Sequence, residues 1–379
     1  MTAPEMSWRI AGGCVPDGDA MVPRDVALAD GVIVESGSAS AQVFDATGCW
    51  VLPGIVDIHG DGFERQIMPR PGVRFPLDMA FADTDRQLVA NGITTAFHGV
   101  SVSWEPGLRG VETAAEVVAA LSRLRPHLAC DTRLHLRWEV FAHDEMETVL
   151  GWLREAEGPI LAFNDHTADA MEGGRLDRKL EQWAGRAGVT PEAYRALAKR
   201  VWDRRAEIAG AVERMACSAR ETGAILLAHD EDTPATRQRY RTLGAAASEF
   251  PLTTETARAA REAGEHTVLG APNVVRGGSH NGSLDATAAV ADGLCTVLAS
   301  DYYYPALLNA PFVLAERGVL PFARAWDLVS RHPAELARLD DRGSLAPGKR
   351  ADVVVIDPEG PAEPKVRATF AAGRPVLLG

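Results

Sequence analysis

The sequence of 379 residues predicts an α/β protein whose main part is a (β/α)8 barrel of the TIM type, joined to a small β-sandwich domain built from both chain termini. Three observations lead to this fold class. Eight short apolar runs with strand character alternate with helical patterns along the middle of the chain. Both ends of the chain are rich in β patterning. The length suits one large barrel together with a smaller module.

The eight apolar runs are the predicted barrel strands. The first run, 51–58, consists of buried-type residues and is followed by polar ones. The other seven runs are 93–97, 133–141, 160–164, 224–228, 246–250, 267–269 and 296–299. Helical patterns lie between them, as at 112–124, 191–221 and 254–263. Strands that alternate with helices in this way form a parallel sheet, and eight such units close into a barrel.

The two ends of the chain are expected to fold together. Asp30-Gly31 stands between the apolar runs 26–29 and 32–35, and this dipeptide favours a type I′ hairpin. Near the other end, 352–356 and 369–378 return to β patterning. Because the two β-rich ends bracket the barrel, we expect residues 1–50 and 343–379 to form one small β-sandwich domain and residues 51–342 to form the barrel.

Composition and charge exclude several classes of protein. The formal net charge of −13 disfavours nucleic-acid binding, because an acidic chain repels phosphate backbones, although a local basic pocket for one anionic ligand remains compatible with it. The five cysteines are scattered, and no pair has the spacing of a zinc knuckle, which favours a reducing cytoplasm. No signal peptide and no membrane-spanning stretch is evident. We therefore expect a cytoplasmic enzyme without membrane partners and leave a homo-oligomer open.

Histidines and carboxylates, the residue types that commonly bind metals, stand at the ends of five predicted strands. Chemistry in such a barrel lies at the carboxyl ends of the strands, where all eight meet. A single histidine or carboxylate at one strand end is weak evidence, but five at the same end of one barrel favour a shared site. The residues concerned are His59 and Asp61 after the first strand, Glu139 near the end of the third, Asp165 and His166 after the fourth, His229 after the fifth and Asp301 after the eighth.

This set of ligands predicts a divalent metal centre, expected to hold two ions. Imidazole nitrogens with carboxylate oxygens suit zinc, manganese, iron or nickel, and the mixture does not choose between them. Two metals bridged by hydroxide would hold a nucleophile over the barrel mouth. Asp301 is the expected general base, since a carboxylate after the eighth strand is well placed to take the proton of that water. Glu139 could serve as the anionic bridging ligand.

The predicted substrate is a small anionic phosphorylated molecule. Arg70 and Arg74 follow the first metal motif, and a glycine-rich stretch follows the seventh strand. Loops after strands seven and eight commonly bind phosphate in such barrels, and arginine forks match phosphate oxygens. The glycine-rich stretch offers four further side chains with hydrogen-bond donors, which are Asn273, Arg276, Ser279 and His280.

Several motifs resemble those of the ribose 1-methylphosphonate 5-triphosphate diphosphatases of the carbon–phosphorus lyase pathway, a branch of the amidohydrolase superfamily. The most specific is Gly270-Ala-Pro-Asn-Val-Val-Arg-Gly-Gly-Ser-His280, whereas Leu52-Pro-Gly-Ile-Val-Asp-Ile-His59 marks only the superfamily. The resemblance spans nearly the whole chain. Its other motifs are Pro69-Arg-Pro-Gly-Val-Arg74, Asn91-Gly-Ile-Thr-Thr95, Arg133-Leu-His-Leu-Arg137 with Glu139, Ser300-Asp-Tyr-Tyr303, Asp341-Arg-Gly343 and Gly348-Lys-Arg-Ala-Asp352.

The resemblance implies hydrolysis of a triphosphate ester at a binuclear metal site. A metal-bound hydroxide would cleave a phosphoanhydride bond of α-D-ribose 1-methylphosphonate 5-triphosphate and release pyrophosphate. Arginines, including Arg137 in one of the shared motifs, would bind the substrate and neutralise charge on the leaving group. The implied metal ligands are the set already reached from the strand ends, namely His59, Asp61, Glu139, His166, His229 and Asp301.

One stretch departs from the family pattern. After the first histidine the family usually reads Thr-Asp-Asn-Leu, whereas this chain reads Gly60-Asp61-Gly62-Phe63. The presumed ligand is kept and two polar side chains beside it are lost. Three alternatives therefore stay open: hydrolysis of a C–N bond in a small amide, cyclic imide or amidine, a paralogue that acts on another phosphorylated substrate, and a non-catalytic anion-binding protein.

Overall fold

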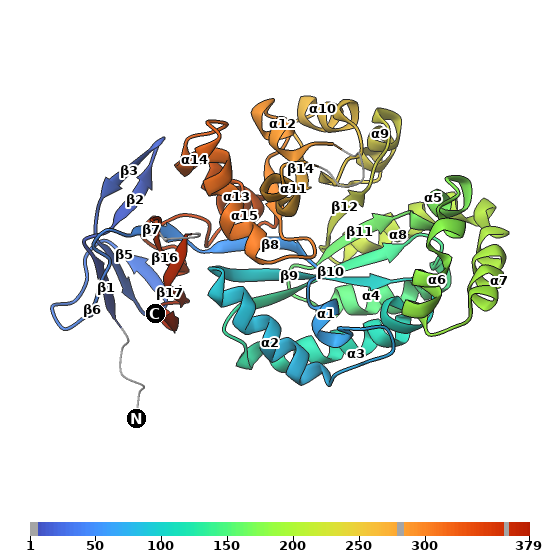
Figure 1. Ribbon diagram of the computed structural model, residues 1–379, viewed down its shortest axis with the longest axis horizontal. Helices are drawn as coiled ribbons and strands as arrows, with labels where there is room; N and C mark the ends of the chain where they lie inside the picture. Colours follow the sequence, from blue (N-terminus) through green and yellow to red (C-terminus); the bar gives the residue numbers. More distant parts are fainter. Residues whose placement is uncertain (1–6, 279–283, 360–363) are drawn as a thin grey trace.

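The computed structural model describes residues 7–278, 284–359 and 364–379. Its largest sheet is an eight-stranded parallel barrel that is nearly closed (Figure 1). Hydrogen bonds from Asp61 N to Asp301 O (2.8 Å) and from Asp301 N to His59 O (2.9 Å) connect the last strand to the first at the barrel mouth. The strands follow one another in chain order as β8 (Ile55–Gly60), β9 (Ile93–Val102), β10 (Asp131–Glu139), β11 (Ile160–Asn164), β12 (Ile225–His229), β13 (Ala247–Glu249), β14 (His266–Gly270) and β15 (Val297–Ala299).

Helices surround the barrel as the alternating pattern predicts. Apolar side chains fill both the barrel interior and the space between strands and helices, because both faces of a parallel barrel sheet are buried. The outer helices are α2 (Leu77–Ala90), α3 (Val111–Leu124), α4 (Met146–Glu155), α8 (Ile208–Glu221), α9 (Pro234–Thr242), α10 (Thr254–Glu262), α12 (Ala286–Ala291), α13 (Pro305–Glu316), α14 (Phe322–Asp327) and α15 (Arg331–Leu336).

Several shorter helices and turns follow the carboxyl ends of the barrel strands. The helical pattern predicted at 191–221 is two helices, α7 (Pro191–Trp202) and α8, separated by a short 3-10 turn, Arg205–Glu207. Together with α5 (His166–Glu172) and α6 (Arg175–Ala187), α7 lies at the end of the molecule opposite the chain termini (Figure 1). The remaining short elements are α1 (Glu64–Ile67), α11 (Ala271–Arg276) and the 3-10 turn η1 (Gly107–Arg109).

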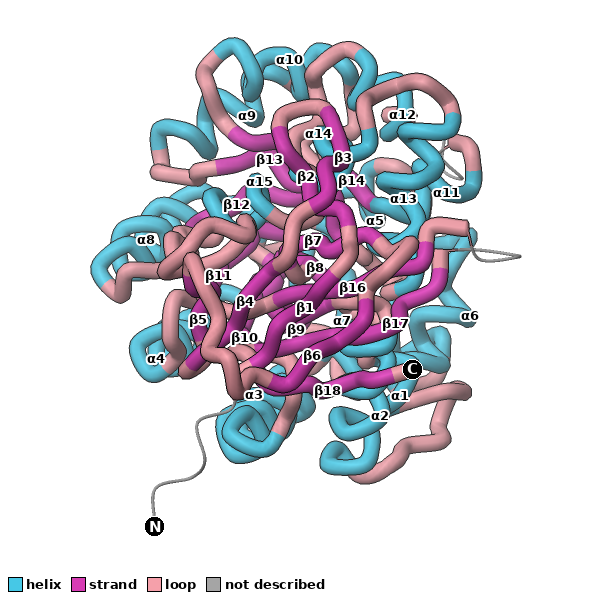
Figure 2. Tube along the Cα trace, turned by 90° about the vertical axis from the view of Figure 1, so that its left-hand side faces the viewer, coloured by secondary structure: helices cyan, strands magenta, loops and turns pink. Residues whose placement is uncertain are grey.

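The two chain termini form two separate sheets (Figure 2). One has the order β5-β4-β1-β6, and the other has the order β18-β17-β16-β7-β2-β3. Side chains from both sheets, among them Ile10, Leu28, Val353 and Phe370, share one apolar cluster. The strands are β1 (Trp8–Ala11), β2 (Cys14–Asp17), β3 (Ala20–Pro23), β4 (Val26–Ala29), β5 (Val32–Val34), β6 (Gln42–Asp45), β7 (Trp50–Pro53), β16 (Val353–Asp357), β17 (Lys365–Ala371) and β18 (Arg374–Leu378).

The hairpin predicted around Asp30-Gly31 is present. β4 and β5 pair antiparallel through Ala29 and Val32. Asp30 and Gly31 have φ angles of 50° and 81°, the left-handed values that a type I′ turn requires at both central positions.

The apolar run 51–58 is not one barrel strand. β7 pairs with β16 in a terminal sheet, and β8 begins the barrel only at Ile55. Gly54 lies between them, and a Cβ there would lie 2.2 Å from Thr94 Oγ1, so the close packing of the two segments requires glycine. The predicted limit between residues 50 and 51 thus falls within β7, and the division into domains stays a prediction. No helix of the described residues is long and apolar enough to cross a bilayer.

Candidate active site

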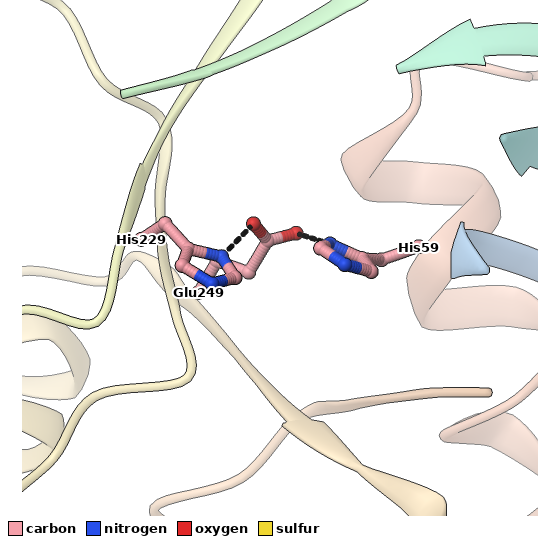
Figure 3. A group of neighbouring side chains, drawn as sticks. All are labelled: His59, His229 and Glu249. Carbon is pink, nitrogen blue, oxygen red and sulfur yellow. Dashed lines mark hydrogen bonds and ion pairs between the residues drawn. The ribbon is translucent and has the colours of Figure 1, made fainter. Parts of the chain in front are cut away.

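Two histidines and a glutamate meet inside the barrel mouth. His59 comes from β8, His229 from β12 and Glu249 from β13, and each is the last or next-to-last residue of its strand. One carboxylate oxygen of Glu249 lies 2.8 Å from His59 Nδ1, and the other lies 2.7 Å from His229 Nδ1 (Figure 3). A single carboxylate therefore orients two imidazole rings from opposite sides.

This arrangement turns the Nε2 atoms of both rings away from Glu249, and only that of His229 has a neighbouring donor, Arg137 Nη2 at 3.4 Å, within the described residues. With Nδ1–H donated to Glu249, each ring presents a lone pair at Nε2. His59 Nε2 is buried and has no hydrogen-bond partner among the described residues. Metal-ligating histidines characteristically donate their other ring N–H to a carboxylate, and the donor set around these rings is one that divalent metals accept. The site thus fits the divalent metal that the ligand-type residues of the sequence predict.

Burial and charge act in opposite directions on this cluster. Burial tends to raise the pKa of Glu249, but electrostatic attraction to the imidazole rings of His59 and His135 and hydrogen bonds from His229 and His59 outweigh it and hold that pKa well below its usual value. Burial tends to lower the pKa of His59, and Glu249 raises it above the ordinary value. Burial also lowers the pKa of His135, whose ring centroid lies 4.8 Å from that of His59, to about 3.

Two further groups of ligand-type residues share these histidines. In one, His59 joins Asp61 and Asp301, and in the other His229 joins His166 and Asp230. Within each group one ligand atom of every residue lies within 4.8 Å of the others. The groups therefore form a continuous row across the mouth rather than isolated clusters.

The backbone is strained where three strands end at this row. Asp230, Phe250 and Asp301 follow β12, β13 and β15, and their φ angles are 57°, 54° and 55°. Left-handed conformation costs an ordinary residue about 1–2 kcal/mol, and such costs concentrate at functional sites. Here the conformation places two carboxylates at the rim of the row.

The two carboxylates near His59 titrate differently. Burial, followed by repulsion from Asp61, raises the pKa of Asp301 to about 7. Burial also tends to raise the pKa of Asp61, but Arg137 and Arg109 more than offset it and lower that pKa. Environments that separate neighbouring carboxylates in this way are typical of sites that divide acid and base roles.

Arg137 links the groups across the mouth. Its Nη1 donates to Asp61 Oδ2 at 2.9 Å, and its Nη2 lies 3.4 Å from His229 Nε2. Next to it, Arg109 is held by a bidentate ion pair with Glu64, with N–O distances of 2.8 to 3.3 Å. Both arginines line two pockets that adjoin the row, and His166 is also common to the two.

Glu139 lies beside the row but is not part of it. It accepts hydrogen bonds from His166 N (3.1 Å), Thr167 N (3.2 Å) and Thr167 Oγ1 (2.7 Å), so both its oxygens are engaged at the start of α5. Burial, partly offset by His166, raises its pKa to about 7. It belongs to none of the three ligand groups of the described residues, and its role as a bridging ligand stays a prediction.

The predicted substrate-binding residues fall into three sets. Arg137, Asn273 and Arg276 line the pocket that also contains His229 and Asp301. Arg70 and Arg74 are exposed, Arg74 pairs with Glu116 at 3.5 Å, and neither lines a pocket at the mouth, so the structure does not bring them to the site. The predictions for Ser279 and His280 concern positions outside the described residues.

Sequence reasoning did not identify Glu249 or Arg109 as site residues. Glu249 is the last residue of β13, within the predicted run 246–250, and the rule that examines strand ends for carboxylates could have found it. Arg109 lies on a 3-10 turn well beyond β9, where no pattern in the sequence indicates that it turns back to the mouth.

The two glycines that depart from the family pattern pack against Tyr304. A Cβ on Gly60 would lie 2.7 Å from Asp57 Oδ2 and 3.0 Å from the Tyr304 ring, and a Cβ on Gly62 would lie 3.0 Å from the same ring. Tyr304 is only 2% exposed. The buried ring thus occupies the space that larger side chains at these positions would need.

Comparisons with known sequences identify a family and a relative of this chain. A model of the amidohydrolase family matches residues 80–377. The α-D-ribose 1-methylphosphonate 5-triphosphate diphosphatase of Escherichia coli (strain K12) is 32% identical over 335 residues, which cover 85% of this chain and 86% of that protein.

Solved structures share the fold at low identity. A D-hydantoinase from Bacillus sp. AR9 has a TM-score of 0.63 at 16% identity and covers 98% of this chain and 95% of its own. A Xaa-Pro dipeptidase with bound methionine has a TM-score of 0.65 at 14% identity and covers 98% of this chain and 100% of its own. On the evidence of the family match and the relative from E. coli, this chain belongs to the amidohydrolase family and is a hydrolase.

Proposed function

We propose that this hydrolase cleaves a phosphoanhydride bond of α-D-ribose 1-methylphosphonate 5-triphosphate and releases pyrophosphate. The relative from E. coli carries that activity in its name and matches most of the chain. The observation that carries the proposal is the meeting of two pockets at Arg109 and Arg137, beside the row of histidines and carboxylates. A polyanionic substrate needs such fixed cations where its scissile bond lies.

The proposed cofactor is a divalent metal, zinc or else manganese, iron or nickel, with two ions as the working hypothesis. His59 and His229 would hold it through Nε2, and the remaining ligands would come from Asp61, His166, Asp230 and Asp301. The bound metal supplies Lewis acidity that makes water a better nucleophile at neutral pH.

Side chains of this protein accept the proton of the attacking water and neutralise the charge of the leaving group. Asp301 lines the second pocket at the rim of the row, and its carboxylate accepts the proton of the attacking water. Arg137, anchored at Asp61, and Arg109, anchored at Glu64, keep their guanidinium groups in place and neutralise charge that develops on the leaving pyrophosphate. Because both arginines are held by carboxylates before substrate arrives, little reorganisation is needed.

One observation favours a second candidate function. Tyr304 fills the space beside Gly60 and Gly62, so the two polar side chains that the family usually carries there have no counterpart. A mouth that lacks them suits a different substrate, and hydrolysis of a C–N bond in a small amide or cyclic imide is the alternative.

The two functions are separated by a panel of substrates. Metal-depleted protein is reconstituted with each of the four metals and incubated with the ribose triphosphate, with nucleoside triphosphates, and with hydantoin and dipeptide amides. Phosphorus NMR follows pyrophosphate, and mass spectrometry follows the products of C–N bond cleavage. We expect pyrophosphate from the ribose triphosphate with at least one metal. Turnover of an amide without release of pyrophosphate from any triphosphate would contradict the proposal.

A further inference from the structure

One of the two pockets at the mouth has no assigned function. It has a volume of about 270 Å³ and lies between the ends of β9, β10 and β11 and the helices α5, α6 and α7. Five cationic side chains line it, against the three carboxylates of Glu105, Glu139 and Asp169. The cations are Arg109, Arg137, Arg175, Lys179 and Arg186.

Several buried polar atoms of this pocket have no partner. Asn164 is 2% exposed, and neither its amide nitrogen nor its amide oxygen makes a hydrogen bond within the described part of the chain. Arg137 Nε and Arg186 Nε are also buried without a hydrogen-bond partner in this part of the chain. A buried polar group without a partner costs about 1–3 kcal/mol, so three such side chains on one pocket indicate a ligand that completes their hydrogen bonds.

The remaining cations differ in how they are held. Arg186 makes an ion pair with Glu105 at 2.7 Å, and Arg175 pairs with Asp169. Lys179 is exposed on α6 and makes no ion pair within the described residues. Its ammonium group is therefore free to meet an anion that enters the pocket.

The neighbouring pocket is less cationic. Among the described residues, it shares Arg109, Arg137 and His166 with the first and adds Arg276 as its one further arginine or lysine, beside the carboxylates of Asp230 and Asp301. A ligand that spans the shared residues would thus place its more highly charged end among α5, α6 and α7. In a ribose that carries a triphosphate at one end and a methylphosphonate at the other, the more highly charged end is the triphosphate.

We propose that the pocket between α5, α6 and α7 and the ends of β9, β10 and β11 is the subsite for the two phosphoryl groups that leave as pyrophosphate, with Lys179 and Asn164 as specificity-determining residues. The inference rests on the proposed function, since it assigns one end of that substrate to one pocket. The sugar and its methylphosphonate then lie toward Arg276 in the neighbouring pocket.

Calorimetric titration of the metal-loaded protein with inorganic pyrophosphate tests this assignment, with the same metal in slight excess in both solutions. Lys179→Ala and Asn164→Ala are the test variants. Lys199→Ala is the matched control, because Lys199 is an exposed lysine on the adjacent helix α7 that does not line the pocket. We expect Lys179→Ala to weaken pyrophosphate binding by about tenfold, as loss of one charge-assisted contact would, and Asn164→Ala by about fivefold, with Lys199→Ala unchanged. Methylphosphonate binding should be unaffected by Lys179→Ala.

The outcomes separate the subsite from the proposed function. If the wild-type protein does not bind pyrophosphate, or if Lys179→Ala and Asn164→Ala bind it as the wild type does, the subsite assignment is wrong even where the triphosphate is hydrolysed. If pyrophosphate binding weakens as expected while no triphosphate is hydrolysed, the subsite stands and the proposed function fails. Circular dichroism of Asn164→Ala confirms that it folds, and Lys179→Ala, at an exposed position, tests the proposal independently of it.

Discussion

The two ends of the barrel both contain buried charged clusters, and they differ in whether their hydrogen bonds are complete. At the amino end, Arg342 reaches Thr95 (2.7 Å), Asp131 (2.8 Å) and Asp341 (2.8 Å), and Asp131 is also paired with Arg125 and Arg133. At the mouth, atoms of His59 and Arg137 are buried without partners within the described residues. A cluster that only stabilises a fold can satisfy itself, whereas one that binds a ligand keeps atoms free for it.

The largest effect should come from removing the base at the mouth. Asp301→Asn keeps the shape of the side chain but cannot accept the proton of the attacking water, so kcat should fall by about 10²–10⁴-fold. Stopped assays of pyrophosphate release measure it. Asp292→Asn, an exposed aspartate after α12, is the control and should retain full activity. Activity of Asp301→Asn close to that of the wild type would exclude Asp301 as the base.

Breaking the amino-end cluster should cost stability instead. The side chain of Arg342 is 4% exposed, and Arg342→Met leaves Asp131 with a buried charge that has lost one of its partners. The free energy of unfolding in urea should fall by about 3–5 kcal/mol, while the metal affinity of the folded protein stays unchanged. A loss of metal affinity without loss of stability would reverse the roles assigned to the two ends.

Acid should reduce the difference in the free energy of unfolding between the wild type and Arg342→Met. Burial tends to raise the pKa of Asp131, but Arg133 and Arg342 outweigh it and hold the pKa below the ordinary value of 3.8. The stabilisation is therefore fully present above pH 3.8 and is lost as pH falls through the lower folded value. Urea titrations should show wild type and Arg342→Met converging below pH 3.8, and a gap that widens on acidification would contradict the ion-pair account.

Glu249 should affect metal affinity at the mouth by orienting the rings of His59 and His229. Glu249→Gln keeps the size of the side chain but removes the charge that holds both Nδ1–H groups, so metal affinity should fall by about 10–100-fold. Competition with a chromophoric chelator measures this affinity. Glu116→Gln, which changes an exposed glutamate, serves as the control. An unchanged affinity would mean that Glu249 does not orient the metal-binding rings.

Adding a methyl group at Gly60, which packs against Tyr304, should lower the stability of the protein moderately. Gly60→Ala brings a methyl group within 2.7 to 3.0 Å of Asp57, Ser300 and Tyr304 and should lower stability by about 1–3 kcal/mol in urea denaturation. Gly151→Ala, in a helix where a Cβ meets nothing within 4 Å, is the matched control and should be neutral or slightly stabilising. Equal effects at the two glycines would remove the steric explanation for the departure from the family pattern.

The smallest effect is expected at the arginine that the structure places away from the mouth. Arg74→Ala removes an exposed partner of Glu116 and should change KM and kcat by less than about twofold, since exposed pairs contribute little. Arg137→Ala, assayed alongside, should lower kcat/KM by about 100-fold or more because its guanidinium lies at the shared edge of both pockets. A large change in KM or kcat on Arg74→Ala would mean that Arg74 does bind the substrate.

Much of the fold could be predicted because strand periodicity and turn chemistry are local signals. The run 160–164 and the Asp30-Gly31 turn have the limits and geometry that the sequence indicates. The split of the run 51–58 could not be predicted in this way, because it depends on how closely Gly54 approaches Thr94 in the folded chain.

The site was predictable to the extent that strand ends converge. The structure places His59 with His229 in one ligand group and with Asp301 in another, whereas Glu139 turns toward the start of α5 and Glu249 takes the position between the two histidine rings. The direction of a side chain at a strand end depends on backbone strain and on competing donors, such as those of Thr167, which a linear pattern does not contain. Arg74 likewise follows the metal motif in sequence yet pairs with a helix outside the mouth.

The Nε2 atoms of His59 and His229 at the mouth should bind a divalent metal, whereas the amino-end cluster should bind none. Anomalous diffraction from crystals soaked in zinc, recorded on both sides of the zinc edge, tests it directly. We predict an anomalous peak in contact with Nε2 of His59 or His229, with Glu249 still bonded to both Nδ1 atoms. Absence of a peak at the mouth under saturating zinc, or a peak ligated by Glu249 with the rings turned away, would rule out a metal site built on these two histidines.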